Sequence, residues 1–177
     1  TGLKLRSHPN LLAHAVPFNM EADSLNSAVL GEHVSPEDPE FDLFIREVRK
    51  EMTVKCGQKC TAVRRVFVPR NQIDNVQEVL TEALAKAVIG DPQEEGVRMG
   101  ALVNKGQKDE VLAKLDLLKS EAHSVYNHPL NLIGDRAIAD AFLGPQLLRH
   151  DDPLNARHCH DVEAFGPVAT LMPYDSL

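Results

Sequence analysis

The stretch Gly57-Gln58-Lys59-Cys60-Thr61-Ala62 joins a helix pattern to a strand pattern. Upstream of it, apolar residues recur at the i, i+3, i+4, i+7 and i+11 spacing of one helix face: Phe41, Phe44, Ile45, Val48 and Met52. Asp38 stands at the N-cap position of this helix, where its side chain is expected to accept hydrogen bonds from free backbone amides. Downstream, residues 63–68 place valine and phenylalanine around two arginines and stop at Pro69, as a strand does. This junction of a helix with a strand favours an α/β fold.

The remaining sequence continues the alternation of helices and strands and contains no internal repeat. Apolar periodicity and turn residues predict two more helices and three more strands, the helices at 71–88 and 108–122 and the strands at 24–29, 146–149 and 168–172. The sequence Gly90-Asp91-Pro92 is a strong stop for the first of these helices. The expected fold class is therefore α/β.

Composition and charge exclude several classes of protein. The 177 residues are 43% hydrophobic and 25% charged, which is typical of one globular domain. A net charge of −7 provides no electrostatic footprint for nucleic acid or for anionic lipid, so neither partner is expected. No apolar run approaches the ~20 residues of a membrane span, and the N-terminal stretch lacks the core of a signal peptide. A soluble, cytoplasmic protein is expected.

The ends of the chain suggest a piece of a longer polypeptide. The first residue is Thr1 instead of methionine, and a strand-like run stops abruptly at Leu177. Elements of a complete active site are therefore expected outside these residues.

Cys60 is the strongest candidate for a nucleophile. The thiolate is the reactive form of cysteine, and nearby basic groups favour it. Four such groups lie close in sequence: Lys55, Lys59, Arg64 and Arg65. Gly57 permits close approach of another part of the backbone. The alternative is a buried cysteine that acts as a small apolar residue.

A metal cluster is a weaker interpretation of the same cysteines. Cys56 and Cys60 are four residues apart, and His158-Cys159-His160 lies far downstream. Zinc usually draws paired ligands from a knuckle, whereas an extended His-Cys-His run sends alternate side chains to opposite faces. No metal is expected, and the two histidines are interpreted as part of a solvated loop. Three cysteines also make a disulfide framework improbable and predict at least one free thiol.

Two ordered motifs resemble those of the aldehyde dehydrogenase superfamily. Gly57, Gln58 and Cys60, with Arg64 following, resemble the family's Gly-Gln-x-Cys motif with its nearby arginine. Glu163-Ala164-Phe165-Gly166-Pro167-Val168 is similar to the family's Glu-x-Phe-Gly-Pro-Val signature. The family also carries a Glu-Leu-Gly-Gly-Lys segment upstream of the nucleophile. Met20-Glu21-Ala22-Asp23-Ser24-Leu25-Asn26 stands there and departs from that pattern after the glutamate.

This variant of the third motif is similar to the bifunctional branch of bacterial phenylacetate degradation, the PaaZ or PaaN type. The resemblance implies the catalytic-domain core of an aldehyde dehydrogenase, an open twisted sheet flanked by helices and truncated at both ends. It implies that residues 1–24 are the tail of a coenzyme-binding domain and that residues 25–177 are a partial catalytic domain. It also implies a homo-oligomer in the full-length protein.

The resemblance further implies oxidation of a CoA-linked aldehyde to an acid, with NADP or NAD as acceptor. The branch substrate would be 3-oxo-5,6-dehydrosuberyl-CoA semialdehyde, and an absent C-terminal domain would open the ring of oxepin-CoA by hydrolysis. By similarity, Cys60 is the nucleophile and Glu21 the general base, while Glu163 binds the nicotinamide ribose and Phe165 packs beside that ring. The 177 residues alone are expected to have little or no dehydrogenase activity.

Three alternatives remain open at this point. The chain could be a non-catalytic interaction or oligomerisation fragment, in which Cys60 would show no special reactivity. It could belong to an acyl-CoA-type reductase, although a base such as Glu21 argues for hydrolysis because release to a thiol needs no activated water. A metal-binding regulator would require stoichiometric zinc.

Overall fold

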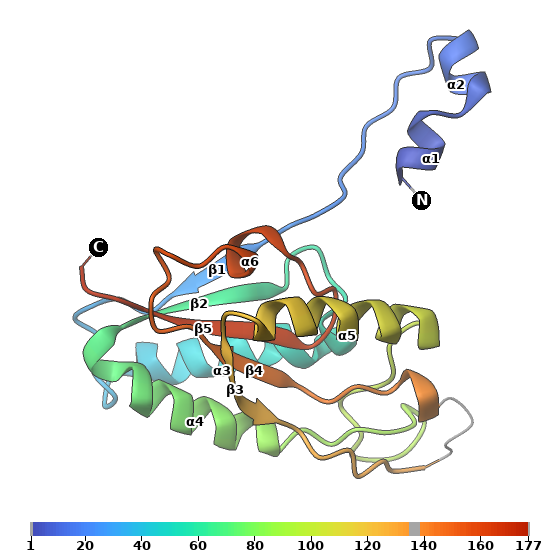
Figure 1. Cartoon of the computed structure of the whole chain (residues 1–177). Coiled ribbons are helices and arrows are strands. Elements are labelled where there is room, and N and C mark those ends of the chain that lie inside the picture. The colour runs from blue at the N-terminus through green and yellow to red at the C-terminus, as the bar shows by residue number, and fades with distance from the viewer. Residues whose placement is uncertain (1, 135–138, 177) are drawn as a thin grey trace.

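The computed structural model describes residues 2–134 and 139–176 of the chain. Within these residues a five-stranded sheet has the order β1-β2-β5-β4-β3 (Figure 1). The strands are β1 (Asn26–Val29), β2 (Val63–Pro69), β3 (His123–Asn127), β4 (Gln146–Arg149) and β5 (Val168–Tyr174). The first four strands in spatial order run parallel, and β3 pairs with β4 in the antiparallel direction.

Helices cover both faces of this sheet, which confirms the open sheet flanked by helices (Figure 1). One face carries α3 (Pro39–Thr53) and α4 (Ile73–Ala85), and the other carries α5 (Lys105–Lys119). The shorter helices are α1 (Gly2–Arg6), α2 (Pro9–Ala13) and α6 (His158–Asp161), and the 3-10 turns are η1 (Val54–Gly57), η2 (Arg70–Gln72) and η3 (Ala139–Ala141). No helix among the described residues is both long enough and apolar enough to cross a membrane.

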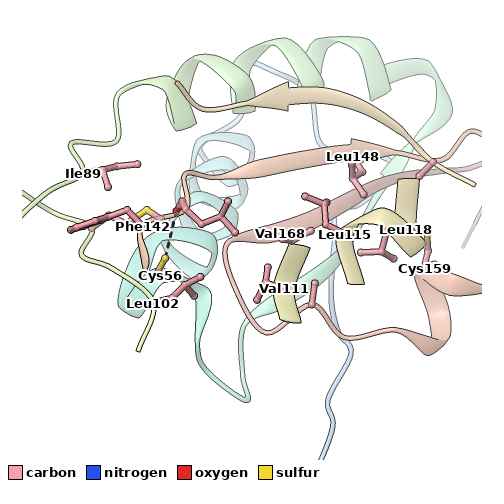
Figure 2. Packing of buried hydrophobic residues seen from close by; sticks show 14 of the residues in the cluster. Cys56, Ile89, Leu102, Val111, Leu115, Leu118, Phe142, Leu148, Cys159 and Val168 are labelled. Carbon is pink, nitrogen blue, oxygen red and sulfur yellow. Dashed lines mark hydrogen bonds between the residues drawn. The ribbon is translucent and has the colours of Figure 1, made fainter. Parts of the chain in front are cut away.

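Strand β5 separates two hydrophobic cores because successive side chains point to opposite faces of a sheet. Ala169 and Leu171 pack with α3 and α4. Val168 and Met172 pack on the other side, and Figure 2 shows Val168 beside residues of α5. The first six residues of β5 are buried, as expected for a parallel strand that is covered on both faces.

Most expected elements are present, but their ends differ for local reasons. Helix α5 begins at Lys105 instead of residue 108 because the Asn104 side chain accepts a hydrogen bond of 2.8 Å from the Gln107 amide and caps it. Helix α4 ends at Ala85 instead of residue 88: the Ala87 amide donates to the Leu84 carbonyl, three residues back, and the Val88 carbonyl accepts the amides of Arg98 and Met99.

Two local expectations were wrong. Asp38 precedes α3, but its side chain caps nothing there and instead accepts the Ser35 amide at 2.7 Å. No strand was predicted between residues 122 and 146, but β3 lies there; it is an edge strand with no buried residue and therefore has no apolar pattern to reveal it.

The N-terminal segment extends away from the sheet before it enters β1 (Figure 1). Helices α1 and α2 contain no buried residue. Leu3 is 72% exposed and Leu12 is 69% exposed. The described core therefore begins at β1.

Helix α6 begins on a carboxylate that follows the end of α5. Glu121 Oε1 accepts the Cys159 amide at 2.7 Å, and Oε2 accepts the Arg157 amide at 3.0 Å. Partial burial works to raise the pKa of Glu121, but these backbone donors outweigh it and lower the pKa to about 2. The histidines of this segment are therefore not in the solvated loop that was expected: His160 is half-buried, and its Nε2 donates to the Pro153 carbonyl at 2.8 Å.

Glu121→Gln should lower the free energy of unfolding in a pH-dependent way. Because the folded pKa is depressed, the carboxylate stabilises the fold above its unfolded pKa of about 4.5, and this contribution is lost as pH falls toward about 2. Urea unfolding of the two proteins should therefore differ most above about pH 5 and converge in acid. A difference that stays constant across this range would contradict the assigned role.

Candidate active site

Three chain segments meet at the amino ends of the parallel strands. Residues 20–25 precede β1, residues 57–62 precede β2, and residues 163–167 precede β5. Because these three strands are neighbours and run in the same direction, the segments that lead into them lie at one edge of the sheet. A pocket of about 430 Å³ lies between them, lined by Met20, Glu21, Ala22, Asp23, Ser24, Cys60, Glu163 and Phe165.

All four residues selected from the sequence line this one pocket. Cys60 and Glu21 are exposed, Phe165 is half-buried, and Glu163 is only 6% exposed. Glu21 Oε1 accepts a hydrogen bond of 3.3 Å from Asn19 Nδ2. The structure thus places these side chains together, while the roles assigned to them remain predictions.

The turn before Cys60 depends on an unusual backbone conformation. Lys55 and Cys56 have φ angles of 52° and 55°, and Gly57 has a φ of 68°. Non-glycine residues pay for this left-handed region. A Cβ added to Gly57 would lie 2.2 Å from the Gly166 carbonyl oxygen, so only glycine lets the two segments touch.

The Arg64 guanidinium links the same two segments from inside. This side chain is 5% exposed and donates from Nη2 to the Gly57 carbonyl at 2.8 Å and from Nη1 to the Gly166 carbonyl at 2.5 Å. Nη2 also lies 3.5 Å from Glu163 Oε1, and the guanidinium carbon lies 5.7 Å from the Phe165 ring centroid. Burial lowers the pKa of Arg64, and the charge of Glu163 opposes that change.

Two further residues hold the Cys60 segment in place, and neither was selected from the sequence as a site residue. The Ser24 amide donates to Glu163 Oε2 at 3.2 Å, and its hydroxyl donates to the Cys60 carbonyl. Asn26 Nδ2 donates to the Cys60 carbonyl at 2.6 Å and to the Ala62 carbonyl at 3.2 Å. The sequence did give one indication: Asp23 and Ser24 stand where the family motif has two glycines, and polar side chains at such positions need hydrogen-bond partners.

The basic residues near Cys60 in sequence do not form the positive cluster that was expected. Lys59 Nζ pairs with Glu51 Oε1 at 2.7 Å. Arg64 donates to the Gly57 and Gly166 carbonyls. Arg65 donates to the Leu25 carbonyl and contacts His160 Nδ1 at 3.3 Å. Lys55 is exposed. Three of the four cations therefore have other partners. Glu51 neutralises Lys59, and the two arginines of β2 bond to acceptors in other segments.

The other two cysteines are packing residues. Cys56 is 1% exposed, and its Sγ donates to the Leu143 carbonyl at 3.6 Å (Figure 2). Burial raises the pKa of Cys56 to about 12, and burial with the nearby Glu121 charge raises that of Cys159 to about 12. All three thiols are free. Within residues 2–134 and 139–176, no three His, Cys, Asp or Glu side chains form a group that could hold a metal ion.

Sequence comparison identifies the class of protein. The sequence model described as "Aldehyde dehydrogenase family" matches residues 17–177. The chain belongs to the aldehyde dehydrogenase family.

Several individual members of the family are similar to this chain. The chain is 44% identical over 176 residues to the 3,4-dehydroadipyl-CoA semialdehyde dehydrogenase of Aromatoleum evansii, and the match covers 98% of this chain and 34% of the relative. It is 30% identical to a putative aldehyde dehydrogenase of Staphylococcus haemolyticus, over 77% of this chain and 29% of the relative. The chain thus spans about a third of the length of these relatives.

Solved structures have the same fold. Aldehyde dehydrogenase C of Pseudomonas syringae, solved with NAD+ and octanal, matches with a TM-score of 0.67 and 25% identity over 87% of this chain and 30% of that one. Betaine aldehyde dehydrogenase of Staphylococcus aureus, solved with NAD+, matches with a TM-score of 0.73 and 20% identity over 88% of this chain and 30% of that one. The second match bears on the fold alone.

Gly57→Ala should destabilise the fold more than Gly96→Ala. Both glycines have positive φ angles, of 68° and 85°, so the left-handed backbone would cost alanine about 1–2 kcal/mol at either position. A Cβ at Gly96 meets nothing within 4 Å, whereas one at Gly57 meets the Gly166 carbonyl. Urea unfolding should show the larger loss for Gly57→Ala, and equal losses would mean that the contact between the two segments carries no constraint.

Iodoacetamide should label Cys60 and spare the two buried thiols in the folded protein. Cys60 is exposed, whereas Cys56 and Cys159 are 1% and 3% exposed with raised pKa values. Mass-spectrometric mapping of the modified peptides at neutral pH measures this, with Cys60→Ala as the control that should lose the labelled peptide. Comparable labelling of all three cysteines would contradict the packing described here.

Proposed function

We propose that this chain supplies the nucleophile, the general base and a cofactor contact of an enzyme that oxidises an aldehyde to a carboxylic acid through a cysteine thioester. One observation carries the proposal: Cys60, Glu21 and Glu163 come from three distant segments and line a single pocket. Membership of the aldehyde dehydrogenase family supports the same chemistry.

Cys60 performs the first step. Its thiolate adds to the aldehyde carbon, which forms a carbon–sulfur bond and leaves the negative charge on oxygen. Among the described residues the backbone amides of Cys60 and Thr61 donate to no protein acceptor, so they are free to stabilise that oxyanion. Ser24 and Asn26 support this step by fixing the Cys60 carbonyl.

Glu21 performs the second step. Loss of hydride from the adduct leaves a thioester on Cys60, which water must cleave. The Glu21 carboxylate takes a proton from that water as it attacks the acyl carbon, and the thiolate leaves. Glu21 suits this task because it is exposed to the solvent that supplies the water and lines the same pocket as Cys60.

The residues present fit a nicotinamide cofactor. Glu163 Oε1 is buried and accepts no hydrogen bond among the described residues, so a ribose hydroxyl is a suitable donor for it. Phe165 lines the same pocket and would pack beside the nicotinamide ring. NADP or NAD, when bound, supplies the hydride acceptor. The sequence offers no metal ligand set for this chemistry, and we propose none.

The Aromatoleum evansii relative supports a class of substrate, because it is named for a dehydroadipyl-CoA semialdehyde. The phenylacetate branch substrate, 3-oxo-5,6-dehydrosuberyl-CoA semialdehyde, has the same chemistry: an unsaturated chain with an aldehyde at one end and a CoA thioester at the other. We therefore propose a CoA-linked semialdehyde of aromatic-compound degradation as the substrate.

The wider organisation is part of the same proposal. Residues 1–24 would be the tail of a coenzyme-binding domain and residues 25–177 a partial catalytic domain, within a cytoplasmic homo-oligomer. An additional domain with ring-opening oxepin-CoA hydrolase activity is the bifunctional form of the proposal. Assay of the natural polypeptide that carries this sequence with each of the two CoA semialdehydes, and with oxepin-CoA, tests these points.

Glu21→Gln should block the hydrolytic step but spare the hydride step. In the natural polypeptide we expect turnover to fall by about 10²- to 10⁴-fold, while one equivalent of reduced cofactor per site still forms in a burst. Rapid-mixing absorbance of the reduced nicotinamide measures both. Glu37→Gln, an exposed glutamate away from the pocket, is the matched control and should behave as the unchanged protein.

Two results would contradict this assignment. Loss of the burst together with turnover would mean that Glu21 is needed before the thioester forms. A larger effect of Asp23→Asn than of Glu21→Gln would transfer the role of base to the neighbouring carboxylate, which lines the same pocket.

A further inference from the structure

We propose that Arg64 is a positioning residue for cofactor binding, which acts by holding Glu163 and Phe165 in place. The inference rests on the proposed function, because it concerns the same pocket. Arg64 itself does not line that pocket, so its effect must pass through the two residues that do.

The contacts of Arg64 place it behind the cofactor-contact segment. Its guanidinium donates to the Gly166 carbonyl at 2.5 Å, lies 3.5 Å from Glu163 Oε1, and stands 5.7 Å from the Phe165 ring centroid. A planar guanidinium can bond two carbonyls and stack on an aromatic ring at once, which an ammonium cannot do. One buried side chain thereby fixes a carboxylate, a ring and the backbone between them.

The two oxygens of Glu163 are not equivalent. Oε2 accepts the Ser24 amide at 3.2 Å. Oε1 lies near Arg64 Nη2 but accepts no hydrogen bond among the described residues. A guanidinium beside a buried carboxylate limits the orientations that the carboxylate can adopt. Arg64 lies beside Oε1 while leaving it free for a hydroxyl donor, so it orients the proposed ribose contact.

Arg64 has no hydrogen bond or ion pair with Cys60 or Glu21 among the described residues. Its other anchor is the Gly57 carbonyl at 2.8 Å, in the turn three residues before the nucleophile. A specific positioning role therefore predicts a change in cofactor binding without an equal change in Cys60 chemistry. A general scaffold role predicts that both change together.

The test compares Arg64→Lys with Arg64→Met, Glu163→Gln and the Arg64→Lys/Glu163→Gln double variant in the natural polypeptide. Arg64→Lys keeps the charge and so guards against loss of folding in Arg64→Met. Arg149→Lys is the matched control, because Arg149 is also partly buried and paired with carboxylates but lies at the other end of the sheet. KM for NAD(P)+, kcat and the rate of Cys60 alkylation by iodoacetamide are measured for each.

We expect Arg64→Lys to raise the cofactor KM by about tenfold or more, with kcat and the alkylation rate within about threefold of the unchanged protein. In the Glu163→Gln background the same substitution should add little, since coupled residues are non-additive. Additive effects, or an equal loss in alkylation, would overturn the inference and leave Arg64 as scaffold.

The outcomes separate this inference from the proposed function. If the unchanged protein shows no saturation with NAD(P)+, the proposed function fails and the inference fails with it. If it saturates and Arg64→Lys has an unchanged KM, only the inference fails.

Discussion

The contact between the turn at Gly57 and the turn at Gly166 is the constraint on which the rest of the site depends. The absence of a Cβ at Gly57 allows the approach, and Arg64 joins the two carbonyl oxygens across it. Removing one partner of a buried charge costs about 3–5 kcal/mol, so the guanidinium and Glu163 secure each other. The segment that carries Cys60 and the segment that carries Glu163 are consequently in direct contact.

The site lies at an unusual edge of the sheet. Ligands of open α/β sheets commonly bind beyond the carboxyl ends of the strands. Here the pocket lies before the amino ends of β1, β2 and β5. Parallel pairing still explains why the three segments meet. In neighbouring parallel strands, the loops that precede the strands lie at one edge of the sheet, just as the loops that follow them lie at the other.

The four residues selected from the sequence line one pocket, whereas the contacts around them were not predicted. Cys60, Glu21, Glu163 and Phe165 were selected because they lie in short motifs that resemble those of the aldehyde dehydrogenase family, and α3, β2 and β5 follow clear apolar patterns. Strand β3 was not predicted because an edge strand with no buried residue has no such pattern. The partners of Lys59, Arg65 and His160 were not predicted because the sequence does not show which acceptors the fold brings near a long polar side chain.

The pocket forms only after segments that are far apart in the sequence have come together. Ser24 and Glu163 are separated by 139 positions, and Arg64 and Gly166 by 102. Contacts of such long sequence separation close late, because the loop entropy must be overcome first. Until β5 inserts between β2 and β4, Glu163 is not near Cys60, and Arg64 lacks the Gly166 carbonyl as an acceptor. A partly folded chain therefore lacks this pocket, which arises only with completion of the sheet.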